Sequence, residues 1–158
     1  MTDEERKEFA LRISQSNKTQ IVVITYEIIL NYIDSAKNCY EDNDVEMMIW
    51  NLKKAKQFIN DLSSNLDFKY SISAELLNLY RYANKIIFNC IIKKNVDGIN
   101  AVENIIENLR VGFDKVAKID NRGAAINNST RVYAGLTYGN NSKLNEVCYT
   151  FDKTSYLR

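Results

Sequence analysis

Residues 18–40 read KTQIVVITYEIILNYIDSAKNCY, and this stretch decides the fold. Its apolar residues recur at spacings of three and four, which is the period of an α-helix. Projected as a helix, they cover about 200° of the circumference, whereas a helix on the surface of a globular protein needs an apolar stripe of roughly 100°. We therefore expect either a helix at the centre of a bundle or a helix with a second apolar face that binds something else.

Three further amphipathic stretches follow: residues 44–66, a stretch from residue 71 or 73 to residue 93, and a stretch from residue 95 to residue 118. The pairs Asn17 with Gln20, and Asn43 with Glu46, have the spacing of a capping box in front of the first two helices. The links are short, and the chain contains no proline that would interrupt a helix. Short links make neighbouring helices antiparallel, so the sequence predicts an all-α fold, an antiparallel up-down four-helix bundle.

This bundle is expected to span residues 17–118, between an N-terminal segment of residues 1–16 and a C-terminal tail of residues 119–158. The tail begins with the helix-breaking sequence Asn121-Arg122-Gly123. Two of its stretches, residues 132–138 and 146–151, are β-prone and are separated by turn-forming residues. A hairpin, a strap over the bundle and a mobile tail all agree with this pattern.

Charge and hydropathy exclude several classes of function. The net charge of +1 argues against a dedicated nucleic-acid surface, which needs a strong excess of basic residues. No apolar run exceeds four residues, so we expect no insertion into a membrane. The first residues are acidic and carry no apolar signal sequence, which predicts a cytoplasmic protein.

The chain contains no histidine, which removes the usual general base and the ligand of most transition-metal sites. It also lacks a phosphate-binding glycine loop and a Cys-x-x-Cys pair. Its three cysteines are far apart in the sequence and are typical of small core side chains in a reducing compartment. We therefore expect no enzyme, no cofactor and no metal. An enzyme site built from buried carboxylates is the alternative.

Several apolar side chains do not suit a closed bundle, which points to protein binding. Trp50 projects away from the apolar stripe of its helix, and Tyr82 and Phe88 lie off the stripe of theirs. Trp and Tyr are frequent anchors of protein interfaces, although Trp50 could equally pack against a terminal segment. Together with the wide helix over residues 18–40, the candidate partner-binding residues are Ile24, Tyr26, Ile28, Ile33, Trp50, Tyr82 and Phe88.

The order of motifs between residues 17 and 116 resembles the FliS family of flagellin export chaperones. The family's helix opening, Ser-Pro-Glu and apolar residues up to Leu-Tyr, corresponds to residues 17–26, although Lys18 replaces the proline. Residues 51–62 are similar to the family's second helix. Leu79-Tyr80-Arg81-Tyr82 resembles its Leu-Tyr-x-Tyr motif, and Leu109-Arg110 resembles its closing Leu-Arg. The differences, together with the long tail, indicate a divergent member of the family.

The resemblance implies a function. Proteins of this family bind the C-terminal segment of flagellin in the cytoplasm, prevent its premature polymerisation and present it to the flagellar export gate, without a cofactor. The free chaperone would be a monomer or a weak homodimer. The alternative is a helical-bundle adaptor or regulatory protein that binds a different client.

In the family, the N-terminal segment covers the empty client groove. In this chain the matching apolar residues of that segment are Phe9, Leu11 and Ile13. The tail offers a second cover. Its candidate covering residues are Val132, Tyr133, Leu136 and Tyr138.

Overall fold

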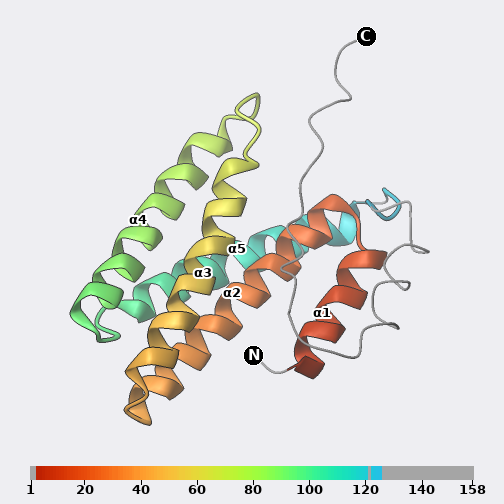
Figure 1. The fold of residues 1–158 in the computed structure, drawn as a ribbon. Helices are drawn as coiled ribbons and strands as arrows, with labels where there is room; N and C mark the ends of the chain where they lie inside the picture. The colour runs from red at the N-terminus through yellow and green to blue at the C-terminus, as the bar shows by residue number, and fades with distance from the viewer. Residues whose placement is uncertain (1–2, 121, 126–158) are drawn as a thin grey trace. The chain divides into compact units, whose positions relative to one another are not determined.

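The computed structural model describes residues 3–120 and 122–125, all of which belong to one compact unit of the chain, residues 1–127. These described residues form five helices and no strand (Figure 1). The helices are α1 (Asp3–Gln15), α2 (Lys18–Glu41), α3 (Val45–Ser64), α4 (Ile72–Lys93) and α5 (Ile99–Ile119). The predicted helical bundle is thus confirmed. The β-prone stretches of the tail lie outside the described residues.

Four of the helices enclose a common core. Helix α2 packs against α3 and α5, and α4 packs against the same two helices from the other side. The wholly buried aliphatic side chains at the centre come from all four helices and include Ile29, Ile33, Leu52, Ile59, Ile87 and Ile106. Burial of each such side chain contributes about 1.5–3 kcal/mol relative to leaving it in water. These contacts, rather than helix propensity, stabilise the fold.

The start of α2 has the predicted capping box. The main-chain N–H of Gln20 donates to Asn17 Oδ1 at 2.9 Å, and the main-chain N–H of Asn17 donates to Gln20 Oε1 at 2.8 Å. Both bonds satisfy N–H groups that have no partner within the helix. Asn17 therefore fixes the first residue of α2.

The start of α3 differs from the prediction by one residue. Asp44, not Asn43, is the N-cap, and its Oδ1 accepts a hydrogen bond from the main-chain N–H of Met47 at 3.0 Å. Asn43 has a φ of 58°, a left-handed conformation that asparagine adopts more readily than most residues. The prediction was wrong because the turn uses this asparagine for its backbone and not for its side chain.

The N-terminal segment is itself a helix, α1, which packs against α2. Its first turn carries Asp3, Glu4 and Glu5, and acidic residues at this end interact favourably with the helix dipole. No residue of α1 is buried. Helix α1 is therefore an added layer and not a member of the core.

Candidate partner-binding site beneath helix α1

One face of α2 is turned toward α1. We call it the covered face; it consists of Ile24, Glu27, Ile28 and Asn31. These residues are spaced i, i+3, i+4 and i+7, so they lie along one side of the helix. Ile24 and Ile28 are buried. Polar contacts at Glu27 and Asn31 join this row to α1, which shows that α1 provides the cover.

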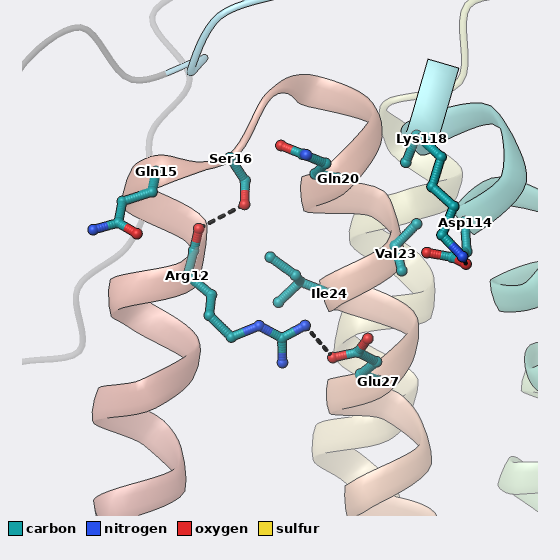
Figure 2. A pocket seen from close by; sticks show the side chains of 10 residues that line it. Arg12, Gln15, Ser16, Gln20, Val23, Ile24, Glu27, Asp114 and Lys118 are labelled. Carbon is teal, nitrogen blue, oxygen red and sulfur yellow. Dashed lines mark hydrogen bonds and ion pairs between the residues drawn. The ribbon is translucent and has the colours of Figure 1, made fainter. Parts of the chain in front are cut away.

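The two polar contacts differ in strength. Arg12 Nη2 lies 2.6 Å from Glu27 Oε2, and Figure 2 shows the guanidinium reaching from α1 to this carboxylate. Closer to the start of α1, Asn31 Nδ2 donates to Glu5 Oε1 at a longer distance of 3.3 Å. Both are partly exposed to solvent, so each contributes little to stability but fixes the position of α1 along α2.

The apolar contacts of α1 come from Phe9 and Ile13, which are partly buried and pack against the core. They are four residues apart and therefore share a face of α1. Leu11 keeps 46% of its surface exposed. It is two residues from Phe9, which places it almost on the opposite side of the helix. Of the three side chains predicted to cover the groove, two pack inward and Leu11 does not.

A hollow of about 400 Å³ lies where α1, α2 and α5 meet. Its charged groups are paired, Arg12 with Glu27 and Lys118 with Asp114 at 2.7 Å. Paired charges leave no net field that would select an ion. The residues that line the hollow are Arg12, Gln15, Ser16, Gln20, Val23, Ile24, Glu27, Asp114, Ala117 and Lys118 (Figure 2).

Tyr26 and Ile33, two other predicted partner-binding residues, lie on the opposite face of α2 and have no exposed surface. The hydroxyl groups of Tyr26 and Tyr80 form a hydrogen bond of 2.5 Å between α2 and α4. Burial, reinforced by Tyr80, raises the pKa of Tyr26 far above its ordinary value, so the hydroxyl stays neutral. A partner reaches these two residues only if the bundle itself opens.

Trp50 lies on the seam between α3 and α2. Its ring packs edge-on against Tyr32 at a centroid distance of 6.0 Å, and the Lys54 ammonium lies 5.7 Å from the centroid of the Trp50 ring. Edge-to-face contacts of this kind stabilise aromatic pairs by about 0.5–1.5 kcal/mol beyond burial. Trp50 therefore has a packing role within the bundle, against Tyr32 of α2.

Tyr82 and Phe88 lie on α4 and are 52% and 49% exposed. The Lys56 ammonium of α3 sits 5.0 Å from the centroid of the Phe88 ring. Helix α4 packs against α3 and α5, while α1 packs against α2. The predicted partner-binding residues therefore divide among the covered face, the core, the α2–α3 seam and α4. The predicted covering residues of the tail, Val132, Tyr133, Leu136 and Tyr138, lie outside the described residues.

The polar residues of this site were missed by sequence reasoning. Glu27 and Asn31 have the same helical spacing as Ile24 and Ile28, so their place on one face was readable from the sequence. Their partners, Glu5 and Arg12, were not, because nothing in the sequence showed that residues 3–15 form a helix against α2. Partners that come from separate helices become visible only in the fold.

The described part of the chain contains no group of three or more histidine, cysteine, aspartate or glutamate side chains placed to hold a metal ion. Within the same residues, no helix is both long and apolar enough to cross a membrane.

A search of curated proteins yields no match. The family model of flagellar protein FliS matches residues 1–120 of the 158 residues, which includes α1 and the whole of the bundle. The chain therefore belongs to the FliS family of flagellar export chaperones.

Proposed function

We propose that this protein binds the C-terminal segment of flagellin in the cytoplasm, prevents its premature polymerisation and aids its export. The observation that carries the proposal is the covered face of α2, whose two buried apolar residues, Ile24 and Ile28, lie under a helix without a single buried residue. A cover of this kind is removable. Family membership supplies the class of client.

The covered face already accepts a helix. Phe9 and Ile13 of α1 are spaced as the anchors of an amphipathic helix that lies in an apolar groove. A client segment that is disordered when free would fold over the same face in place of α1, and its ordering would lower the net affinity. In this proposal the bundle is an antiparallel up-down bundle that acts as a rigid template, and it needs no cofactor.

Competition with α1 would set the affinity for the client. Only Ser16 and Asn17 lie between α1 and α2 in the chain, so α1 stays close to the covered face even when it is detached from it. If the cover were absent in about one molecule in a hundred, the apparent affinity for the client would be lowered about a hundredfold. The flagellin segment must therefore bind the open face tightly enough to offset this loss.

The test is a titration of the purified protein with a peptide from the C-terminus of flagellin, followed by calorimetry. We expect a one-to-one complex. Phe9→Ala should tighten binding because it weakens the cover, whereas Leu11→Ala, the control on the exposed side of the same helix, should not. Absence of binding at tens of micromolar peptide contradicts the proposal.

Tyr82 and Phe88 favour a second candidate function, an adaptor or regulatory protein with a different client. These exposed side chains lie on α4, which packs against α3 and α5, whereas α1 packs against α2. In a chaperone the same surface could contact the export gate. A pull-down with the double variant Tyr82→Ala and Phe88→Ala separates the two: if flagellin binding is kept and a second protein is lost, α4 serves that second partner. Sedimentation of the free protein should show a monomer or a weak homodimer.

A further inference from the structure

The end of α5 is hydrogen-bonded to the hinge between α1 and α2, which consists of Ser16 and Asn17. Asp120 is the C-cap of α5, and its main-chain oxygen accepts a hydrogen bond from Asn17 Nδ2 at 3.0 Å. Its side-chain Oδ2 accepts a second one from Thr19 Oγ1 at 2.6 Å. Asn17 is also the N-cap of α2. The residue that begins α2 is therefore held by the residue that ends α5.

Arg122 and Ala125, which follow Asp120 in the chain, strengthen this contact. Arg122 donates from Nε and Nη2 to the two carboxylate oxygens of Asp120, at 2.7 and 2.6 Å, and Nη2 also lies 3.3 Å from Thr19 Oγ1. The main-chain N–H of Ala125 donates to the main-chain oxygen of Ser16 at 2.8 Å. Paired, charge-assisted bonds of the first kind are stronger than bonds between neutral groups. Asp120, Arg122 and Ala125 thus hold the hinge and the first turn of α2 through several hydrogen bonds.

The same hinge carries α1. Ser16 is buried, and its hydroxyl donates to the main-chain oxygen of Arg12 in the last turn of α1 at 2.6 Å. Arg12 in turn forms the ion pair with Glu27 on the covered face. Rotation of α1 away from α2 requires the backbone near Ser16 and Asn17 to turn, which strains or breaks their bonds to Asp120 and Ala125. The position of α1 is therefore coupled to the end of α5.

We propose that Asp120 is a positioning residue for α1, and that Asp120, Arg122 and Ala125 together clamp the hinge and so control how readily the covered face opens. The match to the family model ends at residue 120, so Arg122 and Ala125 belong to the part of this chain that follows it. The clamp itself does not depend on the proposed function. Its effect on client binding does rest on that function.

Electrostatics agree with this geometry. The hydrogen bonds from Arg122 and then from Thr19 hold the pKa of Asp120 well below its ordinary range. The carboxylate is therefore charged at neutral pH and accepts bonds from both partners at once. Its own side chain is only 9% exposed, whereas that of Arg122 is 70% exposed. The carboxylate is thus the fixed centre of the clamp, and the arginine is its outer member.

The test is hydrogen exchange of the full-length protein without any client, comparing Asp120→Asn with Glu107→Gln. Glu107 makes the same kind of two-bond contact with Arg110, at 2.7 and 2.6 Å, but entirely within α5. Glu107→Gln is therefore a matched control, because it removes a pair between a carboxylate and a guanidinium group without changing a residue of the hinge. We expect Asp120→Asn to speed the exchange of α1 about fivefold to tenfold while α3 stays unchanged, and Glu107→Gln to leave α1 as it is.

A second variant keeps the proposal falsifiable if Asp120→Asn does not fold. Thr19→Val keeps the shape of the side chain and removes the hydroxyl that bonds Asp120, so it should also speed exchange of α1. If the folded variants leave α1 exchange no faster than Glu107→Gln does, the clamp is overturned. If exchange rises but affinity for the flagellin peptide does not, the clamp stands and the client site proposed under α1 is wrong.

Discussion

The two faces of α2 are closed in different ways. Toward α3, α4 and α5, the helix presents Tyr26, Ile29, Ile33 and Ala36, none of which keeps any exposed surface. Toward α1, it presents the covered face, which is closed by a helix with no buried residue. One face contributes stability, and the other is sealed only as firmly as α1 and its hinge allow. The central position of α2, in contact with α3, α5 and α1, thus accounts for the wide apolar arc of residues 18–40. A second face that binds a partner stays a prediction.

The two faces of α2 also differ in whether their buried polar groups have hydrogen-bond partners. On the core face, the hydroxyl of Tyr26 is bonded to that of Tyr80. On the covered face, Asn31 Oδ1 is buried without a hydrogen-bond partner in the described part of the chain. A buried acceptor left unpaired costs about 1–3 kcal/mol. Water can pair with this oxygen once α1 lifts, which offsets part of the cost of exposing Ile24 and Ile28.

The same substitution on both faces of α2 is the strongest test of whether the two faces differ in their contribution to stability. Ile33→Ala removes a wholly buried side chain and should lower the free energy of unfolding by about 2–5 kcal/mol. Ile24→Ala should cost clearly less, because Ile24 lines the hollow and water or α1 fills the space. Urea denaturation of both variants measures the difference. Equal losses contradict the distinction between the faces.

The tyrosine pair tests whether the core face is as tightly specified as its burial indicates. Tyr26→Phe or Tyr80→Phe alone leaves one buried hydroxyl without a partner, and each should lower the free energy of unfolding by about 1–3 kcal/mol. The double variant removes both hydroxyls and should be close to the native protein in stability. Denaturation of the three variants gives the coupling energy. Additive losses would show that the hydroxyls are not each other's partner.

The same pair predicts how stability responds to alkali. Burial raises the pKa of Tyr26 in the folded protein, so only the unfolded chain ionises this residue near pH 10. Its contribution to stability is complete below pH 10 and is lost as pH rises above it. At pH 11 the loss from Tyr26 is about 1.4 kcal/mol. Urea midpoints at pH 9 and pH 11 measure it, and the double phenylalanine variant should lose less.

Much of the fold was predictable because its signals are local. The apolar period predicted α2 to within one residue at either end, and the capping box of Asn17 and Gln20 was read from their spacing. Asn43 was misassigned because two neighbouring residues, Asn43 and Asp44, are both common N-caps, and only the backbone angle distinguishes them.

The site was less predictable because it is made of pairs distant in sequence. The apolar periodicity of α2 indicated a second face but not which segment covers it. Helix α1 was missed as a helix, since Phe9 and Ile13 are too few to give a clear stripe. The bond from Thr19 to Asp120 joins residues about a hundred positions apart, and no local pattern encodes it.

The smallest expected effect concerns the ion pair that joins α1 to the covered face. The side chains of Arg12 and Glu27 are 40% and 26% exposed, so water screens their attraction. A double-mutant cycle with Arg12→Gln and Glu27→Gln should give a coupling free energy below about 1 kcal/mol in global unfolding. Exchange of α1 should still rise in the single variants, because this pair acts on the cover and not on the bundle. A coupling as large as that of the tyrosine pair would mean that α1 is part of the core, and that the two faces of α2 are not different in kind.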